Sequence, residues 1–341
     1  MTTLPKLTVR LHGGLTPQQC IVQAQAAERA GFDGVWFAEN PFARGILPAA
    51  AACAVATQRL GIGAGVFNPY NRHPTLIAME IGALDELAGE QASGRMRLGI
   101  GSGVGGAVER IGMSYARPVT ALGEAIAIVR ALLAGEEVTF AGEVFKIDRV
   151  KLDYAPRRDI AIFMAGRGDR SLALCGERAD GLLVSNMCTA AFVARSAALM
   201  REAAARAGRM GPLGVVRYMP CCVAEDRAEA IAAAKRAVGE MLPTYWRLGQ
   251  RLEGAKQALT MDSNIGEAQF AAAAERLRAG EDAAAVLDEH FVEAFAIAGT
   301  AADCAAQVAA CGEAGVTELA LTFSSGNTVA EMRSLVSALD S

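Results

Sequence analysis

The amino-acid sequence predicts an α/β protein of the (β/α)₈ barrel class, the TIM barrel, on three observations. Eight short apolar or β-branched segments alternate with helical segments, which is the order that a closed parallel sheet requires. The same junction, a helix end followed by a Gly or Ala-Asp break and then a strand, recurs at residues 27–37, 176–184 and 312–322. The 341 residues suffice for one large α/β domain or two smaller ones.

Short apolar runs bounded by turn residues mark the expected strands. These strands cover residues 7–11, 33–38, 60–67, 95–101, 160–165, 180–184, 213–223 and 317–322. Thr16-Pro17 begins a helix that Gly31 ends, and Pro74 and Pro118 begin two more, because proline is favoured in the first turn. The expected helices cover residues 17–30, 46–57, 74–88, 118–134, 189–207, 225–240, 300–311 and 328–339.

Two segments exceed the simple alternation of strands and helices. Residues 136–152 alternate apolar and polar side chains around Ala141-Gly142, which indicates a hairpin insertion. Residues 241–298 read as a helical insertion before the last strand–helix unit. Neither segment is rich in Pro, Gly or Ser, so we expect a single domain over 1–341 with two insertions.

Composition excludes several classes of protein. Lys and Arg (33) nearly balance Asp and Glu (37), and no basic stripe with aromatic residues is present, so nucleic acid is not an expected partner. The eight cysteines form no C-x-x-C pair, which favours buried, reduced thiols in the cytoplasm over disulfides or a metal site. The longest stretch without charge, between Arg44 and Arg59, is too short to span a membrane.

The active site of such a barrel lies at the carboxyl ends of its strands, so the residues that follow each strand are the candidates. His12 ends the first strand and Glu39-Asn40 end the second. Glu39 is a candidate for proton transfer, with an ordinary salt bridge to Arg44 as the equal alternative. His73 precedes Pro74, where capping a helix is its first expected role.

Glycines are concentrated at the ends of the third and fourth strands. Gly61, Gly63 and Gly65 leave one face of the third strand bare, and "GIGSGVGG" (99–106) follows in the next strand. Two bare neighbouring faces predict a notch for a planar heteroaromatic ring, although either strand alone is explained as well by relief of crowding. After Ala165, Gly166-Arg167-Gly168 leads into a helix and resembles a phosphate cradle.

The segment "GSGVGG" (101–106) also fits the G-x-G-x-x-G pattern of dinucleotide-binding folds. In those folds the pattern follows the first strand, with an acidic residue about 20 positions further on at a strand end. Here three strand–helix units precede it, and Glu124 lies inside a helix. We therefore reject the dinucleotide-binding alternative.

Longer motifs resemble the luciferase-like (LLM) flavin and deazaflavin oxidoreductases. The segments that carry the resemblance are "RLGIGAGVFNPYNRHPTLIAMEIGALDELAG" (59–89), "GRMRLGIGSG" (94–103), "ADGLLVSN" (179–186) and the region 295–321. They are most similar to the branch that depends on coenzyme F420 and is typified by methylenetetrahydromethanopterin reductase. The resemblance implies a TIM barrel, commonly a homodimer, that binds F420 or FMN at its mouth and transfers hydride to or from a small organic substrate.

The resemblance also implies roles for single residues. It implies a cis peptide bond at Gly65-Val66, within a bulge behind the cofactor ring, and phosphate contacts in the loop after the fifth strand. The expected cofactor-binding residues are Gly65, Val66, Asn68, Gly101, Ser102, Gly103, Ala165, Gly166, Arg167 and Gly168.

The sequence departs from the family pattern at two places. Several F420-dependent relatives have Asp-His where this chain has Glu39-Asn40, and others have a glutamate near the position of Val104. Glu39 or His12 would then handle protons, and the expected catalytic set is Glu39, Asn40, His12 and His73. Two alternatives stay open: an FMN-dependent monooxygenase and a non-catalytic flavin-binding protein.

Overall fold

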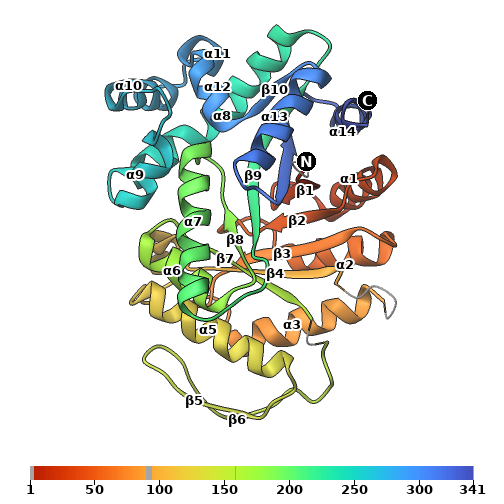
Figure 1. The fold of residues 1–341 in the computed structure, drawn as a ribbon, viewed down its shortest axis with the longest axis vertical. Helices are drawn as coiled ribbons and strands as arrows, with labels where there is room; N and C mark the ends of the chain where they lie inside the picture. The colour runs from red at the N-terminus through yellow and green to blue at the C-terminus, as the bar shows by residue number, and fades with distance from the viewer. Residues whose placement is uncertain (1–3, 90–93, 158, 341) are drawn as a thin grey trace.

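A computed structural model describes residues 4–89, 94–157 and 159–340 of the chain (Figure 1). Eight parallel strands form a closed ring in the order β1-β2-β3-β4-β7-β8-β9-β11, and β11 pairs back with β1. The strands are β1 (Lys6–His12), β2 (Gly34–Ala38), β3 (Gly61–Phe67), β4 (Met96–Gly101), β7 (Ala161–Ala165), β8 (Gly181–Val184), β9 (Gly214–Val223) and β11 (Glu318–Phe323). The prediction of a (β/α)₈ barrel is confirmed, and each expected strand is found.

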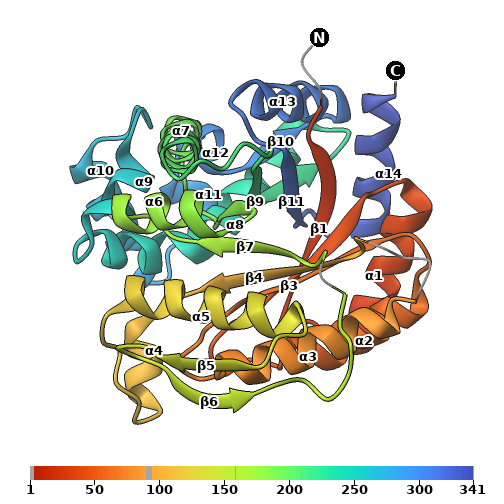
Figure 2. The ribbon, with the colours of Figure 1, turned by 60° about the horizontal axis from the view of Figure 1, so that its bottom comes forward.

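Helices form the outer layer around the ring (Figures 1 and 2). The helices that follow the strands are α1 (Pro17–Ala30), α2 (Ile46–Ala56), α3 (Pro74–Leu87), α4 (Gly105–Arg110), α5 (Pro118–Leu133), α6 (Asp169–Arg178), α7 (Ala190–Arg206), α8 (Arg227–Gly249), α13 (Ala301–Glu313) and α14 (Thr328–Leu339). The helix expected over 225–240 extends to Gly249 in α8. Within the described residues, no helix is long and apolar enough to span a bilayer.

Both expected insertions have the secondary structure that the sequence indicates. Strands β5 (Val138–Ala141) and β6 (Lys146–Val150) form an antiparallel hairpin, which is held by Glu124 of α5 through the backbone N–H groups of three consecutive hairpin residues. The second insertion contains α9 (Glu253–Thr260), α10 (Glu267–Arg278), α11 (Ala283–Val286) and α12 (Glu289–Phe295). It ends in a short strand that the sequence did not predict, β10 (Ile297–Gly299), which pairs with β9 outside the ring.

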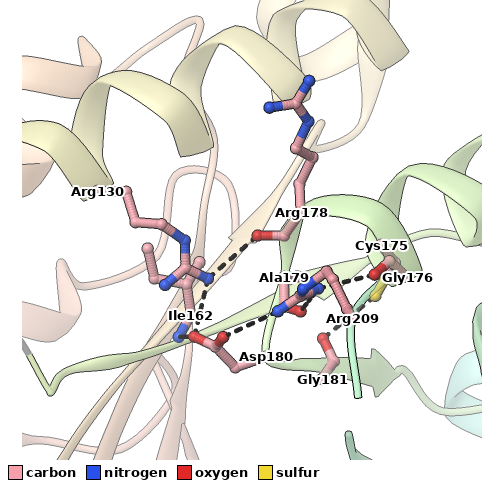
Figure 3. Close-up of polar contacts among 9 residues, drawn as sticks. All are labelled: Arg130, Ile162, Cys175, Gly176, Arg178, Ala179, Asp180, Gly181 and Arg209. Carbon is pink, nitrogen blue, oxygen red and sulfur yellow. Dashed lines mark hydrogen bonds and ion pairs between the residues drawn. The ribbon is translucent and has the colours of Figure 1, made fainter. Parts of the chain in front are cut away.

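The turn before β8 joins three strands through one residue, Asp180, whose contacts with Ile162, Arg130 and Arg209 are drawn in Figure 3. The backbone N–H of Asp180 donates to the carbonyl of Ile162 at 2.7 Å, and its Oδ2 accepts the Ile162 N–H at 2.8 Å. Its carbonyl accepts the N–H of Gly214 at 3.1 Å. Arg130 and Arg209 also donate to its carboxylate, at 2.9 and 3.4 Å. The backbone and carboxylate of one residue therefore fix the starts of β7, β8 and β9 together.

The same pattern of three hydrogen bonds occurs at the other two recurring junctions of the sequence. In each, the residue before the strand exchanges two hydrogen bonds with the preceding strand and accepts one from the next. Asp33 does so with Leu7 and Gly61, and Thr317 does so with Val215 and Lys6. The recurrence in the sequence thus reflects a repeated way of aligning adjacent strands.

Packed side chains fill the interior of the ring. Trp36 is fully buried between Phe163 and Tyr218, with ring centroids 5.5 and 6.5 Å away. Near the amino ends of the strands Arg97 forms an ion pair with Glu318, and Trp36 Nε1 donates to the same carboxylate at 2.6 Å. Because packed side chains fill the interior, a binding site is expected at the carboxyl ends of the strands.

Candidate active site

Small apolar side chains line the inner wall of the barrel at the carboxyl ends of its strands. Ala38 at the end of β2, Val66 in β3 and Ala165 at the end of β7 all pack on the interior cluster around Trp36 and Phe163. Val66 and Ala165 are only partly buried, so this wall reaches the mouth. Such a wall suits one face of a flat apolar ring.

The bare face that the sequence predicts on β3 is filled by side chains of the protein at Gly61 and Gly63. A Cβ on Gly63 would lie 2.3 Å from the Trp36 ring, and one on Gly61 would lie 2.8 Å from the Arg97 guanidinium. The prediction of a ligand notch over Gly61 and Gly63 is therefore wrong. These glycines make room for side chains of the neighbouring strands, which is the crowding explanation.

Higher on the same strand a bulge brings Val66 across β4. The Gly65–Val66 peptide bond is cis, as the family resemblance implied, and the β3–β4 register shifts between Ala64 and Phe67. Gly65 has φ of +151°, and a Cβ there would lie 2.4 Å from the Gly99 carbonyl oxygen. A Cβ on Gly101 would lie 2.9 Å from Val66 Cγ2. The glycines of β4 thus accommodate the bulge, and Val66 presents the apolar surface.

Glu39 lies directly after β2 and pairs with Arg72 instead of Arg44. Arg72 Nη2 lies 3.4 Å from Glu39 Oε1, and Arg72 also forms an ion pair with Glu80. The guanidinium packs over the Phe67 ring at 4.7 Å, which fixes its position. The alternative salt bridge to Arg44 is wrong, because Arg44 donates to the carbonyls of the turn after β1.

Burial raises the pKa of Glu39 above that of a free glutamate, and the nearby Arg72 charge only partly opposes this. The side chain is 18% exposed, so it can still exchange protons with a bound molecule. This is the direction expected for a general acid. Arg72 is the residue of the candidate site that sequence reasoning missed, although it stands in the quoted motif "NPYNRHP" (68–74).

His12 ends β1 with a defined tautomer. The backbone N–H of Gly14 donates to its Nδ1 at 3.2 Å, so the proton of the neutral ring lies on Nε2. Burial lowers the pKa of His12, and the charge of Arg10 lowers it further. His12 is thus a neutral hydrogen-bond donor near pH 7. Asn40 is exposed in the loop after Glu39, and its carbonyl accepts from Ala43.

His73 caps α3, as its position before Pro74 predicts. Its Nδ1 accepts the N–H of Thr75 at 3.3 Å and lies 2.8 Å from the Thr75 hydroxyl oxygen. The ring also contacts Phe145 of the hairpin edge-on at 5.5 Å. These contacts assign His73 to the junction of α3 and the hairpin.

The loops after β3 and β4 pack on one another. The amide of Asn68 occupies the space over Gly103, where a Cβ would lie 2.4 Å from Asn68 Nδ2. Gly103 has φ of +73°, which also favours glycine. The Tyr115 hydroxyl donates to Ser102 Oγ at 2.9 Å. Asn68, Ser102 and Gly103 therefore lie close together at the ends of β3 and β4.

Arg167 lies in the loop after β7 and points across the end of β8. Its Nη2 donates to Ser185 Oγ at 2.7 Å and to the Asn186 carbonyl at 2.9 Å, and its guanidinium stacks over Tyr245 at 4.8 Å. No carboxylate of the described residues forms an ion pair with it, and its Nε is buried without an acceptor. The positive charge of Arg167 is therefore uncompensated.

The cradle around Arg167 is partly closed and partly open. Gly166 packs against Ser171 of α6. A Cβ on Gly254 of α9 would lie 2.6 Å from the carbonyl oxygen of Arg167, so this side of the cradle is closed. Gly168, the N-cap of α6, has open space on its Cβ side. An open glycine, a helix N-terminus and an unpaired guanidinium suit a phosphate group. Across the described ranges, no cluster of His, Cys, Asp and Glu suits a metal ion.

Comparison with known proteins gives the family. A model of the luciferase-like monooxygenase family matches residues 1–318, so the chain belongs to this family. The 5,10-methylenetetrahydromethanopterin reductase of Methanolobus tindarius is 30% identical over 302 residues, which are 87% of each chain. The F420-dependent glucose-6-phosphate dehydrogenase of Nakamurella multipartita is 28% identical over 229 residues, 63% of this chain and 66% of that one.

Among solved structures, the coenzyme F420-dependent tetrahydromethanopterin reductase of Methanopyrus kandleri superposes with a TM-score of 0.80. The alignment covers 99% of both chains at 22% identity. An F420-dependent secondary alcohol dehydrogenase in complex with an F420–acetone adduct gives a TM-score of 0.79 at 18% identity. At these identities the likeness establishes the barrel fold, which is shared from end to end.

Proposed function

We propose that the protein binds coenzyme F420 at the barrel mouth and transfers hydride between this deazaflavin and a small organic substrate. The observation that carries the proposal is the pairing of an apolar wall at Val66 with an uncompensated guanidinium at Arg167. A cofactor with a flat ring and a phosphate-bearing tail matches both parts of this site, because its ring can pack on the apolar wall and its phosphate can bind the guanidinium. The names of the most similar relatives, reductases and dehydrogenases that use F420, supply the identity of the cofactor.

The residues at the mouth have separate tasks under this proposal. Arg167 and the open N-terminus at Gly168 would hold the phosphate, and Ala38, Val66 and Ala165 would support the ring. Bound F420 would supply or accept the hydride, as cofactors carry the redox chemistry in such enzymes. Packed side chains below the mouth exclude water from one face of the ring.

Glu39 and His12 are the groups that can manage a proton. Glu39 has a raised pKa and can hold a proton on its carboxyl for transfer to the substrate, while Arg72 orients it. His12 presents Nε2–H as a neutral donor and can fix an oxygen of the substrate. We keep Asn40 and His73 as weaker members of the catalytic set, because their contacts are with loop and helix backbone.

Two variants separate cofactor binding from proton transfer. Arg167→Ala removes a charge-assisted contact, so F420 affinity should fall by about tenfold to a hundredfold in a fluorescence titration. Glu39→Gln preserves shape, so F420 affinity should stay near the wild-type value while single-turnover hydride transfer slows by about a hundredfold. Arg206, an exposed arginine of α7 that pairs with Glu202, provides the matched arginine control.

The same titration with FMN tests the alternative cofactor. Tight binding of FMN without binding of F420 would contradict the proposal and favour the monooxygenase alternative. Normal turnover by Glu39→Gln together with normal F420 binding by Arg167→Ala would contradict both residue assignments. Binding of F420 with no reduction of any candidate substrate would favour the non-catalytic alternative.

We also propose that the single-domain chain works as a homodimer in the cytoplasm. The outer faces of α2 and α3 carry exposed apolar side chains, among them Val55, Leu76, Met79 and Leu87, which a second copy could cover. All eight cysteines are buried and unpaired, as suits a reducing compartment. Sedimentation at micromolar concentration should give a dimer for the wild type and for Met210→Glu, and a monomer for Met79→Glu. A monomeric wild type would contradict the proposal.

A further inference from the structure

Arg10 places a positive charge inside the barrel at the mouth. It precedes His12 by two residues on β1, so both side chains point to the interior. Its guanidinium packs over the Tyr218 ring at 5.2 Å, and Nη1 donates to the Thr322 hydroxyl oxygen at 3.4 Å. The side chain is partly exposed, so it borders the open mouth and not only the packed core.

The charge of Arg10 is not neutralised by the protein. The other arginine inside the ring, Arg97, has Glu318, and Arg72 at the mouth has two carboxylates. In the part of the chain that the structure describes, no carboxylate forms an ion pair with Arg10. Its Nε is buried and has no acceptor. A half-buried guanidinium with an unused donor is a site for an anionic acceptor.

Arg10 and Arg167 lie on opposite sides of the ring. Arg10 is on β1 and Arg167 follows β7, and in the order of the closed sheet these strands are four places apart in either direction. One phosphate group cannot contact both walls of a barrel of eight strands. If the cofactor phosphate is held at Arg167, a second anionic group is needed to satisfy Arg10.

We propose that Arg10, assisted by Thr322, binds an oxyanion of the substrate, so that the substrate is an organic carboxylate or phosphate ester. This assignment rests on the proposed function, because the cofactor must take the site at Arg167 for the substrate to take the one at Arg10. Arg10 and Thr322 then fix the substrate on the β1–β11 side of the mouth. His12 lies on the same strand and would contact the same end of the substrate.

His12 provides a direct reporter of binding at Arg10. The charge of Arg10 is one of the two causes that lower the pKa of His12. An anion bound to Arg10 would offset that charge and raise the pKa of His12. The chain has only three histidines, so the C2 protons of His12, His73 and His290 can be followed separately by proton NMR.

The experiment titrates the histidines with and without succinate as the probe, at constant ionic strength. Succinate should raise the midpoint of His12 by on the order of half a pH unit, and the neutral analogue succinamide should leave it unchanged. Arg10→Gln should raise the midpoint without succinate and abolish the response to succinate. Arg201→Gln, a surface arginine on α7, should respond as the wild type does.

The outcomes of the titration distinguish an anionic group of the substrate from an anionic group of the cofactor as the occupant of the Arg10 site. The succinate response should persist in the presence of saturating F420. An equal response in Arg10→Gln, or none in the wild type, would overturn the oxyanion site. If F420 alone raised the His12 midpoint and prevented any further rise on addition of succinate, the site would belong to the cofactor, and the substrate assignment would be overturned. Absence of F420 binding would overturn the proposed function and the substrate assignment, while the response to succinate would still report the anion site.

Discussion

Replacing Asp180 by alanine tests how much the barrel depends on one of its strand junctions. The substitution leaves the Ile162 N–H without its side-chain acceptor, which costs about 1–3 kcal/mol for a buried donor. It also removes two half-exposed ion pairs, with Arg130 and Arg209, each worth at most about 1 kcal/mol. We expect the free energy of unfolding to fall by about 2–4 kcal/mol.

Asp180→Asn separates the two contributions. Asparagine keeps an oxygen for the Ile162 N–H but removes the charge, so this variant should lose only about 1 kcal/mol. Urea unfolding followed by circular dichroism measures both variants at low and high salt. The gap between Asp180→Asn and the wild type should shrink in salt, while the gap between the alanine and asparagine variants should persist.

A surface aspartate provides the control for this series. Asp169 is 64% exposed and pairs with Arg195, so Asp169→Ala should cost less than about 1 kcal/mol. Equal losses for Asp180→Ala and Asp180→Asn would refute the reasoning, because the backbone hydrogen bond would then contribute nothing. A loss below 1 kcal/mol for Asp180→Ala would refute it as well.

Two further predictions concern the mouth and the interior. The pKa of Glu39 is raised in the folded protein, so ionisation of Glu39 destabilises the fold. The stability that protonated Glu39 contributes is complete below the pKa of the unfolded chain and is lost as pH rises through the pKa of the folded protein. Thermal unfolding should therefore show Glu39→Gln equal to the wild type in stability at pH 4 and more stable than the wild type at pH 8, and a less stable variant at pH 8 would contradict this. Gly63→Ala should lose about 3 kcal/mol or more in denaturant unfolding, since its Cβ would lie 2.3 Å from Trp36. Gly106→Ala, which has open space, should be neutral, and equal losses for the two would contradict the packing argument.

The strands of the ring could be predicted because their signal is local. Both faces of a parallel strand are buried, so each reads as a continuous apolar run, and the recurring turn residues mark where it begins. The strand β10 (Ile297–Gly299) has only three residues and exists because β9 extends beyond its neighbours. A pairing of this kind depends on the partner strand, which the local pattern does not contain.

The site was predicted less well because its contacts are not local. Glu39 pairs with Arg72, which is 33 residues away, while sequence proximity favoured Arg44. The bare faces of Gly61 and Gly63 are filled by side chains of neighbouring strands, which no single strand reveals. The family resemblance, in contrast, located the cis peptide bond at Gly65–Val66 correctly.

The three strand junctions give the amino end of the barrel an approximate fourfold symmetry. Asp33, Asp180 and Thr317 precede the second, sixth and eighth strands of the ring, so the pattern recurs at every even position except the fourth. There Arg95 takes the place, and its side chain donates to the backbone carbonyls of Leu60, Ala88, Ala54 and Thr57.

That symmetry is broken at the strand that accommodates the bulge of Val66. A one-residue slip at any of the three junctions would break all of its hydrogen bonds at once, so the stagger of the ring is set there. This stagger also sets how far along the barrel axis the residues at the mouth lie, since Glu39 comes six residues after Asp33 and Ser185 comes five after Asp180. The amino end of the barrel therefore fixes the alignment of the carboxyl end, where we propose that the cofactor binds.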